Sequence, residues 1–162
     1  WESSTEALED LLNTSLSALT TVVAMQLGPA SGETTEAPEP QVVDDGAAHR
    51  ALADVADALR SVQAVYGEST ATPPTGLSAL VAAAATSTSD EAFRSDLAGA
   101  IAAVGDVPPP LYDVDPADTA SPAMASLVDG YEHALGARTA LGTEIASLLG
   151  LTINFSDSDG DG

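Results

Sequence analysis

Apolar residues recur at intervals of three and four along most of this chain, the spacing that places side chains on one face of an α-helix. The clearest stripe lies in residues 45–66 and consists of Ala48, Leu52, Val55, Leu59, Val62 and Tyr66. The alternating pattern of strands is scarce, apart from a possible extended segment at residues 151–155. The sequence therefore predicts an all-α fold.

Capping and breaking signals place the ends of the helices. Ser3 and Ser121-Pro122 are typical of helix starts, whereas Gly28-Pro29 is typical of a helix end. The predicted main helices cover residues 3–27, 45–66, 88–104 and 121–150, with a short helix at 77–85. Acidic, Pro-rich segments at 29–44 and 106–120 are predicted to be exposed linkers.

This pattern predicts an antiparallel helical bundle of four main helices plus one short helix. We expect the bundle domain to cover residues 1–150 and an acidic C-terminal tail to cover residues 151–162. Because hydrophobic residues make up 44% of the chain, they suffice for one small core and exclude an unfolded acidic chain.

The charge balance is extreme, with 25 Asp and Glu against four Arg and a net charge of −21. Nucleic acids and anionic membranes attract proteins through Lys and Arg, so neither is an expected partner. Inorganic cations are the natural partners of such a surface. The composition resembles that of proteins from extremely halophilic archaea, in which molar salt screens the repulsion between carboxylates.

Several features favour export. Asn13 and Asn154 both lie in N-x-[ST] sequons, which predicts a glycoprotein, and the chain opens with Trp1 instead of Met. No apolar stretch long enough to cross a bilayer is apparent, so no transmembrane segment is expected. We expect an extracellular or cell-surface location, with a virion as an alternative.

Both histidines follow an Asp-Gly pair, as Asp45 precedes His49 and Asp129 precedes His133 by four residues. This spacing puts a carboxylate and an imidazole on one helix face, where they could hold a transition metal. However, His133 is predicted on the face opposite the apolar stripe, so we do not expect the two histidines to meet in the core. For His49, the better supported alternative is a solvated histidine in the first turn of a helix that Asp45 and Gly46 begin.

The C-terminus carries Asp157, Asp159 and Asp161 at alternate positions, followed by Gly162. Residues 157–162 resemble the opening of thrombospondin type 3, dockerin and EF-hand loops, which implies that they could bind Ca²⁺. The ligand that closes an EF-hand loop is missing, and the alternative is a flexible acidic tail.

Arg138 falls on the predicted apolar stripe of the last helix in a chain with very few cations. It could bind an anionic group or mark a subunit interface. Alternatively, it pairs with a carboxylate from another helix or lays its stem over the core.

The sequence shows no nucleophile elbow, no H-E-x-x-H motif and no Gly-rich phosphate loop, so we do not expect an enzyme. The sequence predicts a structural or interaction module of a cell surface, filament or virion from an extreme halophile, with protein partners or self-assembly. The alternative is a metal- or calcium-binding helical bundle protein.

Overall fold

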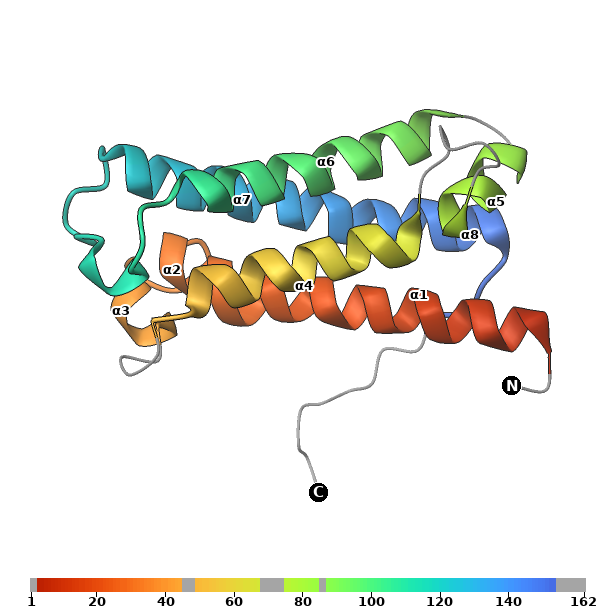
Figure 1. Ribbon diagram of the computed structural model, residues 1–162, viewed down its shortest axis with the longest axis horizontal. Helices are drawn as coiled ribbons and strands as arrows, with labels where there is room; N and C mark the ends of the chain where they lie inside the picture. The colour runs from red at the N-terminus through yellow and green to blue at the C-terminus, as the bar shows by residue number, and fades with distance from the viewer. Residues whose placement is uncertain (1–2, 45–48, 68–74, 85–86, 154–162) are drawn as a thin grey trace, which may run out of the picture.

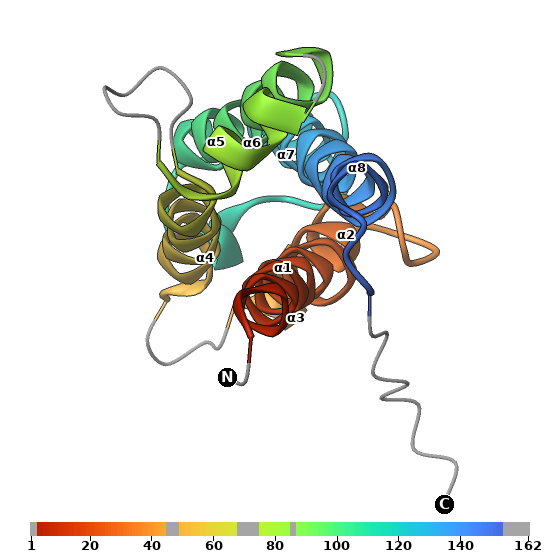
Figure 2. The ribbon, with the colours of Figure 1, turned by 90° about the vertical axis from the view of Figure 1, so that its right-hand side faces the viewer.

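The computed structural model describes residues 3–44, 49–67, 75–84 and 87–153. Within these ranges every regular element is helical and no strand occurs. The long helices lie side by side along the longest axis of the molecule (Figure 1), and viewed from the end they surround a common core (Figure 2). The all-α prediction is therefore confirmed.

The N-terminal helix is longer than predicted, because α1 (Ser4–Thr21) continues through a π-helical turn, η1 (Val22–Leu27), into α2 (Gly28–Ser31). Its predicted start is confirmed, since the hydroxyl of Ser3 accepts a hydrogen bond from the Glu6 amide at 3.1 Å.

The predicted end of this helix at Gly28-Pro29 is wrong. In the wide turn the Gly28 amide bonds five residues back to Val23, and Pro29 follows directly in α2, so the helical run continues past a residue that has no N–H to donate. The helix ends instead at Gly32, whose φ of 87° is readily adopted by glycine.

The segment at residues 29–44 is not simply an exposed linker. It contains the short helix α3 (Pro40–Val43), and both Pro40 and Asp44 are buried. The next helix, α4 (Ala51–Tyr66), begins later than predicted and ends as predicted at Gly67, which has a φ of 82°.

The second half of the chain contains α5 (Gly76–Ala84), α6 (Ser87–Asp106), the 3₁₀ turn η2 (Leu111–Asp113), α7 (Pro122–Thr139), the π-helical turn η3 (Ala140–Ile145) and α8 (Ala146–Leu149). The predicted start of α7 is confirmed, since Ser121 Oγ accepts a hydrogen bond from the Met124 amide at 3.3 Å. The helical run ends at Gly150, also as predicted.

The most extensive helix pairing joins α6 and α7. Small residues allow this close approach: Ala100, Ala134 and Ala137 are fully buried. Leucines from α1, α4 and α6 fill the rest of the core around them, including Leu12, Leu59 and Leu97. Close contact between small residues compensates for the low aromatic content of the chain.

The segment that follows α8 returns to the N-terminal helix. Glu9 accepts a hydrogen bond from the Thr152 amide at 3.0 Å, and the Asn13 side chain donates one to the Thr152 carbonyl at 3.2 Å. Residues 151–153 are not in a strand, and the rest of the predicted extended segment lies outside the described residues.

By length and composition alone, the continuous helix Ser4–Ser31 could cross a membrane, a property that it shares with core helices of soluble proteins and with signal sequences. In the structure 44% of its most apolar 18-residue window is buried inside the molecule. It therefore also serves as a core helix of the fold.

Candidate cation-binding site

Asp44 is a carboxylate whose side chain is 0% exposed, at the junction between α3 and the segment that leads to α4. Its Oδ2 accepts hydrogen bonds from the Tyr112 amide at 3.1 Å and lies 3.2 Å from Nδ1 of His49. Its Oδ1 is buried and has no hydrogen-bond partner. A buried carboxylate oxygen left unpaired costs roughly 1–3 kcal/mol or more, so this atom has unused capacity to accept a cation.

His49 is the side chain that lies beside the Asp44 carboxylate. Its φ of 50° lies in the left-handed region, which is uncommon for a residue with a side chain and is often found at functional sites. The imidazole is 44% exposed and its ring centre lies 6.2 Å from that of Tyr112. Nδ1 faces the buried carboxylate, so this ring nitrogen and the carboxylate oxygens of Asp44 lie close together.

The second histidine forms a similar pair in a different place. Nδ1 of His133, on α7, lies 3.1 Å from Oδ1 of Asp96, on α6. Two glycines make room for the pair, because an added Cβ would lie 2.8 Å from the His133 ring at Gly99 and 2.5 Å from Asp96 Oδ2 at Gly136. Unlike Asp44, Asp96 is 32% exposed, so water can satisfy its free oxygen.

His133 contacts a different aspartate from the one four residues before it. His133 pairs with Asp96 across two helices, while Asp129 is exposed on α7. His49 pairs with Asp44, and Asp45 lies outside the described residues.

Other predicted ligands are not placed. Asp157, Asp159 and Asp161, the candidate calcium ligands, lie outside the described residues. Within the described ranges, no three His, Asp or Glu side chains are grouped so as to hold a metal ion by themselves. A cation at Asp44 and His49 would therefore need further ligands from water or from a chelating molecule.

The two sequons differ in what the structure shows. Asn13 is half-buried, and its Nδ2 donates hydrogen bonds to the Glu9 carbonyl at 2.8 Å and to the Thr152 carbonyl at 3.2 Å. A glycan on this nitrogen would replace one of its donor hydrogens. Asn154 lies outside the described residues, and glycosylation at either site stays a prediction.

A second buried carboxylate, Asp90 on α6, was not anticipated from the sequence. Its Oδ1 accepts hydrogen bonds from the Tyr66 hydroxyl at 2.9 Å and the Ser78 hydroxyl at 2.6 Å, and its Oδ2 lies 3.7 Å from Arg94. Burial raises the pKa of Tyr66, and the hydrogen bond to Asp90 raises it further. Because both oxygens have partners, this cluster fastens α4, α5 and α6 together and leaves no oxygen for a cation.

Comparison with known proteins identifies one relationship. Residues 1–148 match the family model described as Imelysin, peptidase M75. No curated protein and no solved structure matches the chain.

The match overturns the prediction of a structural module of a filament or virion, because it assigns the chain to a peptidase-like, iron-related family of surface proteins. It gives no support to the halophilic, archaeal, viral or glycosylated character that the composition suggested. Members of the family are generally secreted or surface-associated, which agrees in part with the expected extracellular location.

Proposed function

Because this chain belongs to the imelysin family, we propose that it is a secreted or surface-associated protein that binds iron at Asp44 and His49. The observation that carries this proposal is the buried Oδ1 of Asp44, which has no hydrogen-bond partner beside an imidazole. Carboxylate oxygen and imidazole nitrogen are both good iron ligands, so the residues present fit the ion.

The surroundings favour a cation at this position. The net charge of −21 concentrates cations near the surface, and the hydrogen bond from the Tyr112 amide to Oδ2 holds the carboxylate of Asp44 in place beside the imidazole. Two protein ligands leave the remaining coordination positions to water or to a chelate that delivers the iron. We therefore propose weak, exchangeable binding of the kind suited to capturing iron at a surface.

We also propose that the chain does not hydrolyse peptides, despite the name of the family. In support, the described residues hold no three-ligand metal group of the kind that peptidases use to activate water. Incubation with unstructured casein, with and without added Zn²⁺ or Fe²⁺, should leave the casein intact. Cleavage that is lost in a His49→Gln variant would overturn this part of the proposal.

The finer description of the fold belongs to the same proposal. We propose an antiparallel bundle of four main helical units, formed by α1 with its extension, α4, α6, and α7 with its extension. The support is that successive long helices run in opposite directions along the molecule (Figure 1) and that α4 packs on both α1 and α6.

Iron binding can be tested by equilibrium dialysis of the protein against ferrous ammonium sulfate under anaerobic conditions, a method that measures weak and exchangeable binding. We expect about one ion per chain in the native protein and a loss of at least tenfold in affinity for Asp44→Asn and for His49→Gln.

The His133–Asp96 pair provides a matched control, since it has the same histidine–carboxylate geometry without a buried unpaired oxygen. His133→Gln should therefore bind iron like the native protein. Binding that is absent from the native protein, unchanged in both variants at the Asp44 site, or lost in His133→Gln would contradict the proposal.

A further inference from the structure

A groove of about 300 Å³ lies between the N-terminal helix and the last helical unit, away from Asp44. It is lined by Leu16, Thr20, Arg138, Thr139, Gly142 and Thr143. This volume is at the lower end of the range for small-molecule sites. The groove opens where α7 passes into the wide turn η3, and such turns are frequent at functional sites.

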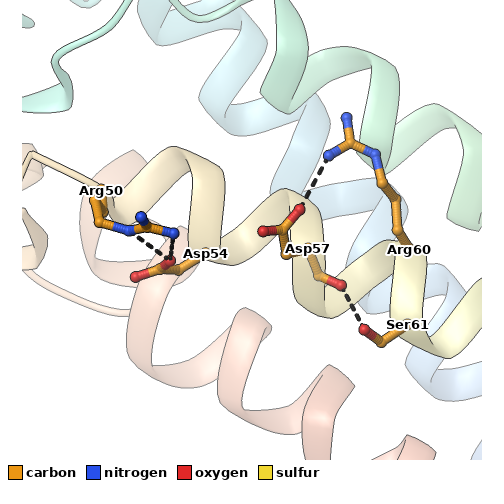
Figure 3. A network of polar contacts seen from close by, with 5 residues as sticks. All are labelled: Arg50, Asp54, Asp57, Arg60 and Ser61. Carbon is orange, nitrogen blue, oxygen red and sulfur yellow. Dashed lines mark hydrogen bonds and ion pairs between the residues drawn. The ribbon is translucent and has the colours of Figure 1, made fainter.

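Arg138 is the charged group of this groove, and it differs from the other arginines of the chain. Arg50, directly before α4, lies 3.4 Å from Asp54, and Arg60 on α4 lies 3.3 Å from Asp57. Figure 3 shows both pairs. Arg94 lies 3.7 Å from Asp90. Half-buried Arg138 has no carboxylate within 4.0 Å among the described residues, although the chain contains 25 Asp and Glu. Its guanidinium therefore remains available to an anion from outside.

The remaining polar groups of the groove are not suited to an anion. The hydroxyls of Thr20, Thr139 and Thr143 each donate a hydrogen bond of 2.7–2.8 Å to a backbone carbonyl four residues earlier. Because their hydrogens are used in this way, these hydroxyls can offer a ligand only acceptor lone pairs and methyl groups. Arg138 is the donor that remains for an anionic oxygen in the groove.

The rest of the lining is apolar. Leu16 is 7% exposed, and an added Cβ at Gly142 would lie 3.3 Å from Leu16 Cδ1, so the missing side chain keeps this part of the groove open. One fixed cation beside an apolar wall matches a ligand with one anionic group and a short hydrocarbon body. The net charge of −21 disfavours ligands that carry several negative charges.

We propose that this groove binds a small aliphatic monocarboxylate, with the carboxylate on the guanidinium of Arg138 and the hydrocarbon chain against Leu16 and Gly142. The carboxylate accepts two parallel N–H donors from the planar guanidinium, which an uncharged alcohol cannot do, and the hydrocarbon chain gains an apolar contact that inorganic phosphate lacks. This site is independent of the iron proposal, because the two share no residue.

The probe for this site is sodium hexanoate, titrated into ¹⁵N-labelled protein and followed by NMR. The expected result is saturable shifts at the amides of Thr139, Gly142 and Thr143, at least tenfold weaker in Arg138→Gln and intermediate in Arg138→Lys. Arg60→Gln is the matched control, since it removes an exposed, ion-paired arginine, and it should bind hexanoate like the native protein.

Two further ligands test the assigned chemistry. Hexanol and inorganic phosphate should each bind much more weakly than hexanoate, since one lacks the charge and the other lacks the hydrocarbon body. Phosphate that competes with hexanoate on equal terms would show a general anion site and overturn the proposal. Equal binding of hexanoate by the native protein and by folded Arg138→Gln and Arg138→Lys would overturn it as well.

Discussion

The imidazole ring of His133 lies directly over the Cα of Gly99, so close that a Cβ at residue 99 would be 2.8 Å from three of the ring atoms. The glycine therefore determines how near α7 can come to α6, the most extensive helix pair of the molecule. The missing side chain also leaves space for the imidazole in the position where its Nδ1 contacts Oδ1 of Asp96.

Replacing Gly99 with Ala should therefore destabilise the protein by about 1–3 kcal/mol, because the ring must leave Asp96 or the helices must separate. Urea denaturation measures the free energy of unfolding. Gly105 on the same helix is the control, since nothing lies within 4 Å of its Cβ position. Gly105→Ala should stabilise the helix by up to about 1 kcal/mol. Equal effects of the two substitutions would contradict this account of the helix contact.

Removing the hydroxyl in Tyr66→Phe should cost about 1–3 kcal/mol, because the buried carboxylate of Asp90 loses one of its two hydroxyl donors. Tyr112→Phe provides a comparison, since Tyr112 is 50% exposed and water replaces its hydroxyl contacts. Its free energy of unfolding should change by less than about 0.5 kcal/mol. If Tyr66→Phe proves equally harmless, the hydroxyl is not needed by Asp90.

Alkaline pH should lower the free energy of unfolding of the native protein, because of the same tyrosine. The pKa of Tyr66 is raised in the folded state above its ordinary value of 10.0, mainly by burial, so the folded chain retains a proton that the unfolded chain releases. This contribution to stability is present below pH 10 and falls as the pH rises above that value. Urea midpoints measured between pH 8 and 11 should fall less steeply in Tyr66→Phe than in the native protein. Parallel slopes would show that Tyr66 does not control the alkaline limit.

Loss of the N-cap in Ser121→Ala should destabilise α7 by about 0.5–2 kcal/mol, since the Met124 amide loses its acceptor. Ser95 is an exposed serine within α6, and Ser95→Ala should be neutral or slightly stabilising because alanine favours helices. Thermal unfolding followed by circular dichroism compares the two. A lower melting temperature for Ser95→Ala than for Ser121→Ala would contradict the assignment of the cap.

The sequence was sufficient to predict elements whose signals are local. Ser3 and Ser121 cap helices through their own hydroxyls, and Gly67 and Gly150 end helices because they adopt positive φ. Those preferences depend on a few adjacent residues. The first helix was predicted too short because Pro29 normally stops a helix, and the wide turn before it gave no sequence signal.

The candidate site depends on distant residues, and for that reason the sequence did not reveal it. Asp44 lies in a segment that is rich in Pro and Glu, and its burial requires the Tyr112 amide, 68 residues away. Likewise, Asp96 meets His133 only because α6 and α7 pack closely. The rule of four-residue spacing considered one helix at a time and therefore could not select Asp96, which lies on a different helix from His133.

The wide turns Val22–Leu27 and Ala140–Ile145 have a consequence for how this chain can vary. A π-helical turn contains about one residue more than the α-helical turn it replaces, so the helix accommodates one additional residue and remains helical. Losing one residue from either turn would restore regular α-helix while α1 and α7 keep their places. These two stretches are therefore the positions at which related chains can differ in length by one residue inside a helix.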